Sequence, residues 1–391
     1  MTKNINDFLR DHENDILTFA SRLVSTMSYS CHEKDAIDLA RKTMLALGYN
    51  QILEDSSGSL IGVLGDGDDT WLFDAHIDTV KVLNPEEWTT YPLSGIIKDK
   101  KLYGRGATDN KGNVAAVIYA GYAMKELGLL KGKTIYIAIT TMEEMFDGLA
   151  LCHALNEHHL RPQHCVICEP SHMNIVLGQK GRTVFHIRTN GVSAHGSSPE
   201  EGKNAIFMMN SVLERVRRKG KALQSEDEPH GSLTVTGIQS ETVSMNSVPR
   251  FCDLWLDRRS TAKDTADTIH AELDGFCEGL DASWDVMTLT GMSYANLPVK
   301  IQNHFMSWHI SEDDPLTGAL SATYKVMFQK EPQYREWNMS TSGVATGARL
   351  GLPTIGFGCG YEKRSHMTDE YCKTDDIVKA AEFYTRLIAM H

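Results

Sequence analysis

Residues 70–80, TWLFDAHIDTV, contain the features that decide the fold and the chemistry expected of this chain. The apolar run at 70–73 is typical of a buried strand, and His76 and Asp78 follow where that strand ends. Side chains two positions apart on a strand point the same way, so the imidazole and the carboxylate are expected side by side. This pattern suits a metal ligand with its orienting carboxylate, although a hydrogen-bonded pair at a loop mouth is its commoner use.

The bulk composition narrows the class of protein. A chain of 391 residues exceeds the size at which one core usually stops growing, so two domains are expected. The net charge of −12 and the pI near 5.7 argue against nucleic acid or an anionic membrane surface as the main partner. No apolar run approaches a membrane span, and the first residues lack the apolar core of a signal peptide. We therefore expect a cytoplasmic protein whose partner is a small molecule.

The cysteine pattern favours reduced thiols. The eight cysteines are scattered, at positions 31, 152, 165, 168, 252, 277, 359 and 372. Cys165 and Cys168 form a C-x-x-C, but they lie in an apolar strand-like run and no second pair accompanies them. Buried free cysteines are the expected reading, ahead of a zinc or redox site.

Strand-like and helix-like segments alternate over the first 170 residues, which is typical of an α/β sheet. The strands are expected at 59–64, 71–74, 134–141 and 164–168, with helices over 33–47 and 113–127. Functional groups of such sheets collect beyond the strand ends. Acidic residues stand at several of these positions, namely Asp109, Glu143, Glu144 and Glu169.

The character of the chain changes after residue 178. Strands expected at 183–189, 232–238, 251–258 and 283–290 alternate with helices at 204–219 and 265–280. This β-α-β-β-α-β order predicts a small ferredoxin-like domain, with a loop at 224–231. A strand at 354–357 and a final helix from Asp375 then resume the first domain. We therefore expect a catalytic domain formed by 1–179 and 294–391, split by an inserted domain at 180–293.

The polar residues together suggest a two-metal hydrolase. Paired metal ions that activate water need histidine and carboxylate ligands, one bridging carboxylate and an unligated carboxylate as base. The chain offers in order His76, Asp109, Glu144, Glu169 and His366. Glu143 projects in a different direction from its neighbour Glu144, so one can bind metal while the other acts as the base. Each acid alone suggests an exposed loop carboxylate, and only the ordered set reverses that interpretation.

Nine segments carry a resemblance to a known family. They are HIDT (76–79), GRGATDNKG (104–112), MEE (142–144), CEP (168–170), GVSAHGSSPEEGKNAI (191–206), NSVP (246–249), DRRS (257–260), STSG (340–343) and SHMTDE (365–370). Over nearly its whole length the chain resembles the M20 metallopeptidases and deacylases, within them the acetylornithine deacetylase and succinyl-diaminopimelate desuccinylase branch. It is similar to a bacterial group of selenium-metabolism-linked hydrolases. The resemblance implies an α/β, mixed-sheet metallohydrolase catalytic domain with an inserted ferredoxin-like α+β lid domain, through which a homodimer forms.

The resemblance also implies roles for the metal-site residues. The implied ligands are His76 and Glu169 for one metal, Glu144 and His366 for the other, and Asp109 as the bridge. Asp78 would orient His76, and Glu143 would be the general base and proton shuttle. In this family the peptide bond at the position of Asp109-Asn110 is commonly cis.

Further residues are implied to recognise the substrate. His195 matches a histidine that reaches the active site of a neighbouring subunit and polarises the scissile carbonyl. Asn246 and Arg258 match positions that bind polar groups or the carboxylate of the substrate, and Ser342-Gly343 match a loop that cradles the carboxylate. The planar fork of arginine suits a carboxylate, and Arg259 is the less favoured of the two neighbouring arginines.

The chain departs from the family pattern at two positions. Cys168 stands where a glycine commonly precedes the Glu-Pro pair, and Ala75 stands where a glycine commonly precedes the histidine. Neither departure removes a ligand. A buried thiol facing the core is expected for Cys168, ahead of an oxidation-sensitive thiol beside the site.

These features predict hydrolysis of an amide or ureido C–N bond in a small carboxylate-bearing substrate, an N-acyl or N-carbamoyl amino acid. The context of the selenium-linked group adds purine-derived ureido acids to this class. A metallo-dipeptidase or carboxypeptidase is the alternative, and an inactive small-molecule binding protein is a third possibility. The expected cofactor is two divalent metal ions, Zn²⁺ first, with Co²⁺ or Mn²⁺ also compatible with histidine and carboxylate ligands.

Overall fold

The computed structural model describes residues 4–224 and 231–391 and divides the chain into two compact units. The first unit comprises Met1–Gln179, Thr290–Val299 and His309–His391, and the second comprises Lys180–Leu289 and Lys300–Trp308. Of the loop expected at 224–231, residues 225–230 lie outside the described residues.

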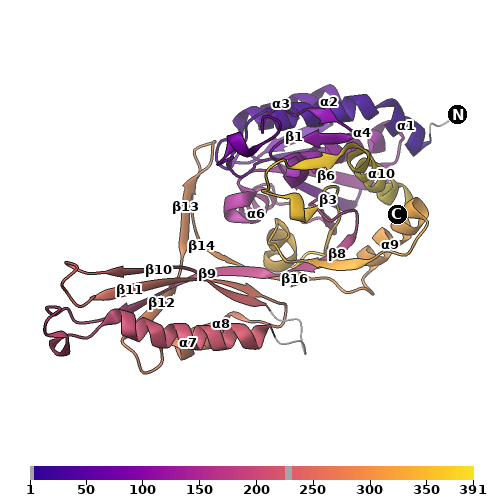
Figure 1. The fold of residues 1–391 in the computed structure, drawn as a ribbon. Helices are drawn as coiled ribbons and strands as arrows, with labels where there is room; N and C mark the ends of the chain where they lie inside the picture. The colour runs from indigo at the N-terminus through magenta and orange to yellow at the C-terminus, as the bar shows by residue number, and fades with distance from the viewer. Residues whose placement is uncertain (1–3, 225–230) are drawn as a thin grey trace. The chain divides into compact units, whose positions relative to one another are not determined.

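Among the described residues, the first unit is built on a nine-stranded mixed sheet (Figure 1). Its centre is parallel and contains β6 (Lys133–Thr140), β3 (Asp69–His76), β7 (His164–Ile167) and β18 (Thr354–Gly356), in that order. The antiparallel strands β2 (Leu60–Gly65) and β1 (Gln51–Glu54) extend one side. On the other side follow β8 (Ile175–Gln179), β16 (Trp308–His309) and β17 (Tyr334–Trp337).

Helices cover this sheet. They are α1 (Ile5–Asp11), α2 (Glu13–Ser25), α3 (Lys34–Ala46), α4 (Gly112–Glu126), α5 (Glu143–Phe146), α6 (Leu149–Glu157), α9 (Pro315–Phe328) and α10 (Thr374–Met390). Helix α4 is buried on nearly all sides and packs against β2, β3, β6 and α10, which explains why its sequence lacks an amphipathic stripe. No helix in the described part of the chain has the length and apolar character needed to cross a membrane.

A small antiparallel sheet joins two segments that are distant in sequence. It contains β4 (Ile97–Lys98), β5 (Lys101–Tyr103) and β19 (Tyr371–Lys373). Because β19 pairs with β5, the segment that carries His366 is held beside the loop that leads to Asp109.

The second unit has the expected β-α-β-β-α-β order. Its elements are β9 (Gly181–Asn190), α7 (Ala205–Leu223), β10 (Ser232–Glu241), β11 (Phe251–Ser260), α8 (Ala266–Cys277) and β12 (Ala282–Val286). The strand order β10-β11-β9-β12 is antiparallel throughout, as in ferredoxin-like domains. Figure 1 shows α7 and α8 on one face of this sheet, and buried side chains such as Met209, Leu256 and Leu273 form the core between them.

The chain passes between the two units more often than the single insertion at 180–293 predicts. After β12, strand β13 (Thr288–Met292) pairs with β14 (Pro298–Gln302), and Thr290–Val299 belong to the first unit. Strand β15 (His304–Phe305) then pairs with β9, which returns residues 300–308 to the second unit. The strand expected over 283–290 is consequently two strands, because only its first half pairs with β9.

Candidate active site

Three neighbouring parallel strands bring the first site residues together at their carboxyl ends. Strand β3 ends at His76, opposite Thr140, the last residue of β6. The N–H of Ile77 donates to the carbonyl oxygen of Thr140 at 2.9 Å, and Glu143 follows three residues later. The N–H of Cys168 donates to the backbone carbonyl oxygen of Asp74 at 2.8 Å, which fixes the start of the segment that carries Glu169. The strand ends therefore gather the side chains that the sequence placed there.

Asp109 lies between the two histidines of the expected site. Its Oδ1 is 3.0 Å from Nε2 of His76, and its Oδ2 is 3.4 Å from Nε2 of His366. The peptide bond between Asp109 and Asn110 is cis, as the resemblance implied. One carboxylate that faces two imidazoles has the placement expected of a bridging ligand.

The remaining expected ligands complete two groups that share Asp109. Oε1 of Glu169 is 3.3 Å from Nε2 of His76, and Oε2 of Glu144 is 2.9 Å from Nε2 of His366. Within each group the candidate ligand atoms all lie within 4.8 Å of one another. All five expected ligands are thus brought together, at a spacing that fits two divalent metal ions.

The electrostatics of the cluster also fit cations. Burial raises the pKa of Glu143 and of Glu169 well above their usual values. Burial alone would raise the pKa of Asp109 as well, but hydrogen bonds with His366 and His76 hold it below its usual range. Hydrogen bonds to Asp109 and Glu144 raise the pKa of His366 to about 10. The carboxylates outnumber the imidazoles in this cluster, so a bound cation would relieve their mutual repulsion.

Glu143, the expected base, lies at the edge of the first group. Its side chain is buried, with Oε2 at 3.9 Å from Nε2 of His76. Glu144 is hydrogen-bonded to His366, whereas Glu143 is not within hydrogen-bonding distance of either imidazole. The adjacent glutamates therefore have the different surroundings that their different expected roles require.

Asp78 supports more of the site than its expected role includes. Its Oδ1 is 3.5 Å from Nδ1 of His76, and its backbone oxygen is 3.1 Å from the same nitrogen. Its carboxylate also accepts the N–H of Glu143 at 2.9 Å, the N–H of Glu144 at 3.1 Å and the hydroxyl of Ser30 at 2.6 Å. Asp78 thus contacts both the expected ligand His76 and the backbone of the two glutamates.

Glu370 is a site residue that the sequence analysis missed. Its fully buried carboxylate accepts the N–H groups of Thr108 and Asp109 at 2.9 and 3.1 Å, and Nη1 of Arg105 donates to it at 2.6 Å. Burial raises its pKa to about 7. Its position at the end of the SHMTDE segment was the signal present in the sequence.

Ser342 and Gly343 lie in a buried loop beside the strand that carries His76. The hydroxyl of Ser342 helps to lower the pKa of Asp74 in β3, which burial raises to about 6. The N–H of Gly343 donates to the hydroxyl of Thr341 at 3.0 Å. Gly148, with φ of +70°, lets this loop approach, since a Cβ there would lie 3.0 Å from the carbonyl oxygen of Ser342.

His195 and Asn246 lie beside each other in the second unit. Both are exposed, and the N–H of Gly196 donates to the carbonyl oxygen of Asn246 at 2.6 Å. Nδ1 of His195 is 2.7 Å from the hydroxyl of Ser197 and accepts the Ser197 N–H at 3.2 Å. In the neutral ring this acceptor role leaves the proton on Nε2, which can then donate a hydrogen bond.

The position of Arg258 does not fit its expected role as a contact for the substrate carboxylate. Its side chain is buried, with Nε at 3.2 Å from Glu272 and Nη2 at 3.2 Å from Asp264, and Nη1 donates to the carbonyl oxygen of Arg259. The guanidinium is therefore satisfied inside the second unit, which argues against a contact between Arg258 and a substrate carboxylate. Arg259 is partly exposed on the strand's other face, where its Nε pairs with Asp257 at 2.8 Å.

The cysteines have the expected state. All eight are free thiols, and Cys165 and Cys168 are fully buried. Burial raises the pKa of the Cys168 thiol well above its usual value, so this thiol is protonated and unreactive at neutral pH. At position 168, where the family commonly has glycine, this chain therefore has a thiol that is buried in the core.

Comparison with known proteins agrees with this geometry. The family model described as Peptidase family M20/M25/M40 matches residues 72–390. A protein named Uncharacterized protein YgeY, of Escherichia coli strain K12, is 32% identical over 381 residues, covering 97% of this chain and 94% of that protein. Succinyl-diaminopimelate desuccinylase of Ehrlichia canis is 23% identical over 389 residues, covering 96% and 93%. The crystal structure of an M20 family metallo-carboxypeptidase, Sso-CP2 of Sulfolobus solfataricus, matches with a TM-score of 0.76 at 17% identity, over 96% of this chain and 98% of that chain.

The structural match shows that the mixed α/β fold is shared. The family model spans most of the chain and includes every expected metal ligand, from His76 to His366. The chain therefore belongs to peptidase family M20/M25/M40 and is a metal-dependent hydrolase of that family.

Proposed function

We propose that the chain hydrolyses an amide or ureido C–N bond in a small carboxylate-bearing substrate, an N-acyl or N-carbamoyl amino acid. The observation that carries this proposal is the placement of Asp109, whose two oxygens face His76 and His366 in two ligand groups. Such a shared carboxylate suits a dinuclear site, and buried Glu143 lies beside it.

The residues would hold the metal ions in the two groups already described. His76, Glu169 and Asp109 would bind one ion, and Glu144, His366 and Asp109 would bind the other. Zn²⁺ is our first choice, and Co²⁺ or Mn²⁺ would suit the same ligands. Bound divalent ions supply Lewis acidity and lower the pKa of water.

Glu143 would move the proton. Its carboxylate would accept the proton of the attacking water and would return it to the leaving nitrogen, which requires a group that ligates neither metal. Asp78 would keep this carboxylate in place through the N–H of Glu143. His195 of a second copy would donate from Nε2 to the scissile carbonyl oxygen, as its Nδ1 contacts allow.

A cavity beside the metal ligands and nearby cationic side chains support the proposed binding of a carboxylate-bearing substrate. A cavity of about 440 Å³ lies beside His366 and is lined by Val80, Lys81, Leu83, Asn84, Trp88, Arg105 and Thr368. We assign the substrate carboxylate to Arg259 in place of the buried Arg258, with Asn246 and the Ser342-Gly343 loop as further polar contacts. Arg259 would exchange its partly exposed ion pair with Asp257 for the substrate.

We also propose a homodimer in the cytoplasm. Strand β10 lies at the edge of the second unit's sheet, where it can pair with a second copy. Thiols as numerous as these suit a reducing compartment.

A substrate panel tests the proposed function. Purified protein would be assayed with N-acetyl, N-succinyl and N-carbamoyl amino acids, purine-derived ureido acids and dipeptides, with Zn²⁺, Co²⁺ or Mn²⁺ present. We expect kcat/KM for an N-acyl or N-carbamoyl amino acid to exceed that for every dipeptide by at least about tenfold. A preference for dipeptides would instead identify a metallo-dipeptidase, and turnover of no member would contradict the hydrolase.

A further inference from the structure

The turn that carries Glu143 and Glu144 is held by side chains from three other segments. The N–H of Thr141 donates to the hydroxyl of Ser59 at 3.3 Å, that of Met142 to Oε1 of Glu33 at 3.0 Å, and those of Glu143 and Glu144 to Asp78 at 2.9 and 3.1 Å. Every backbone N–H of this four-residue stretch thus has an acceptor outside the turn.

The turn requires such help because of its conformation. It joins the end of β6 to the four-residue helix α5, and Met142 has φ of +58°, in the left-handed region that costs a side-chain-bearing residue energy. The first N–H groups of a helix have no partner within the helix, and a buried N–H without a partner is costly. The acceptor side chains therefore decide where this backbone lies.

The side chain of Glu33 accepts a hydrogen bond from this turn and does not cap its own helix, α3. It is completely buried at the start of α3, where a side chain commonly accepts a hydrogen bond from the helix's first N–H groups, yet it makes no such cap. Its Oε1 accepts from Met142 and, at 2.7 Å, from the N–H of Cys31. Its Oε2 has no hydrogen-bond partner among residues 4–224 and 231–391. The carboxyl group of Glu33 therefore makes no hydrogen bond that caps α3.

We propose that Glu33 is a positioning residue, which sets the directions of Glu143 and Glu144 by fixing the N–H of Met142. This inference rests on the proposed function, in which Glu143 moves the proton and Glu144 binds metal. A shift of the Met142 peptide would move both glutamate side chains together, and misplacement of a reacting group by about 1 Å can cost about a hundredfold in rate.

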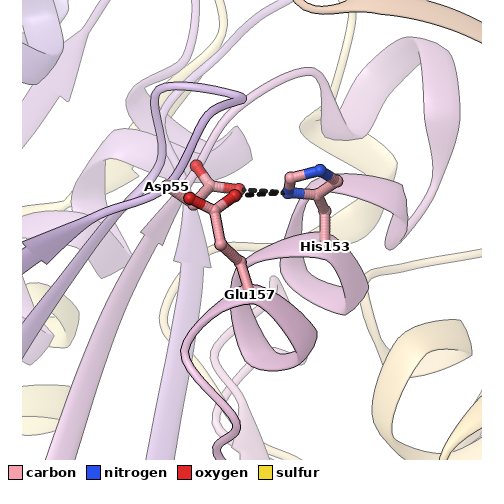
Figure 2. A group of neighbouring side chains, drawn as sticks. All are labelled: Asp55, His153 and Glu157. Carbon is pink, nitrogen blue, oxygen red and sulfur yellow. Dashed lines mark hydrogen bonds and ion pairs between the residues drawn. The ribbon is translucent and has the colours of Figure 1, made fainter.

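The Ser59 contact has its own support farther out. The N–H of Ser59 donates to Asp55 at 2.8 Å, and the hydroxyl of Ser57 donates to both oxygens of Asp55 at 2.8 Å. Figure 2 shows His153 and Glu157 projecting from α6 toward Asp55, and Nδ1 of His153 is 3.0 Å from Asp55 and 3.4 Å from Glu157. These side chains are of metal-ligand type, but both Asp55 oxygens already accept hydrogen bonds from the protein. We therefore interpret the group as an anchor for Ser59.

The protonation state of Glu33 indicates how to test its role. Burial, and then the nearby charge of Asp78, raise the pKa of Glu33 to about 8. At neutral pH the carboxyl group is therefore mostly protonated, with one oxygen free to accept. Glutamine has the same shape and retains that acceptor, methionine has a similar shape without it, and aspartate is one methylene too short to reach Met142.

The experiment compares Glu33→Gln, Glu33→Met and Glu33→Asp with Ile37→Ala as a control. Ile37 is fully buried one turn further along α3, so this control weakens the same helix without removing a side-chain hydrogen bond to the turn. Hydrogen exchange of the peptide covering residues 141–146 would be measured on metal-free protein, with kcat, KM and metal affinity on metal-loaded protein. The exchange readout requires no substrate, so it tests the inference even if the proposed function fails.

We expect Glu33→Met and Glu33→Asp to lose exchange protection in 141–146 and to lower kcat about a hundredfold with KM nearly unchanged. Glu33→Gln would stay within about threefold of wild type in kcat, and Ile37→Ala would lower the Tm without raising exchange in 141–146. The inference is overturned if Glu33→Asp, or Glu33→Met where it folds, keeps wild-type protection and kcat. It is equally overturned if Ile37→Ala raises exchange in 141–146 as much as the Glu33 variants do.

Discussion

Glu143 and Glu144 are neighbours of one residue type that lie in different surroundings, which fits the different functions proposed for them. Glu144 is hydrogen-bonded to His366, whereas Glu143 is buried 3.9 Å from His76. We predict that Glu143→Gln retains its metal and loses at least about a hundredfold in turnover, the usual scale of acid–base catalysis. Metal analysis and steady-state kinetics check this, with the exposed Glu312→Gln as the control. Near-normal turnover would exclude Glu143 as the proton carrier.

The pKa of Glu33 leads to a prediction about stability and pH. Below its usual pKa of 4.5 the carboxyl is protonated in both the folded and the unfolded state. Between about 4.5 and 8 the unfolded state releases this proton while the folded state keeps it, so the free energy of unfolding falls as pH rises. Glu33→Gln removes this loss, and its stability relative to wild type should therefore increase from pH 5 to pH 8.

Urea unfolding of metal-free wild type and Glu33→Gln at several pH values measures that difference. A difference that stays constant between pH 5 and 8 would show that Glu33 is not protonated in the folded state.

The sequence predicted which side chains gather in the candidate metal site, because each follows a recognisable strand or lies in a motif. It missed Glu33 and Glu370 because both act on backbone N–H groups of distant segments, at residues 142 and 108–109, a pairing that only the folded chain creates. For Arg258 a signal was present, since it shares the two-residue period of buried Leu254 and Leu256, whereas Arg259 falls on the other face.

At the level of elements, the central parallel strands of the first unit were the most predictable feature. Strands expected at 71–74, 134–141 and 164–168 correspond to β3, β6 and β7, because continuous apolar runs are typical of buried parallel strands. Boundaries were less predictable in the second unit, where β12 ends at Val286 although the apolar pattern continues. Pairing with β9 decides that boundary, and pairing is not encoded in local pattern.

Gly148 lies between α5 and α6 and against the Ser342 loop, so a substitution at Gly148 tests the function of that loop. Gly148→Ala would cost about 1–2 kcal/mol for its left-handed conformation. It would also push on the loop, since the new Cβ would meet Ala345 N at 2.9 Å and Ser342 O at 3.0 Å. We expect a severalfold rise in KM for a carboxylate-bearing substrate.

Gly128→Ala is the matched control. Gly128 has φ of +68°, and a Cβ added there would meet no atom within 4 Å, so this variant should lose similar stability and keep its KM. An equal KM for both variants would show that the Ser342 loop does not contribute to substrate binding.

At the scale of the whole molecule, the second unit exposes large apolar side chains that would suit the proposed dimer. Edge strand β10 exposes Val235 at 41% and Ile238 at 53%, and α7 exposes Phe207 at 75%. If dimers form and His195 acts on the partner's site, a hybrid of His195→Ala and Glu143→Gln chains contains one intact site. Statistical mixing of these variants should therefore restore about a quarter of wild-type activity.

The control for this mixing experiment combines both substitutions in one chain and pairs that chain with wild type, since such a hybrid contains no intact site. Isolated hybrids of the two single variants without recovered activity would exclude action of His195 across the dimer.

The most direct test of the central claim is the metal content per chain, measured by elemental analysis, together with activity on the acylated and carbamoylated amino acids before and after chelation. We predict about two divalent ions per chain, loss of activity on chelation, and recovery with Zn²⁺, Co²⁺ or Mn²⁺. Binding of no metal under any loading condition, or turnover that persists without metal, would contradict a dinuclear hydrolase.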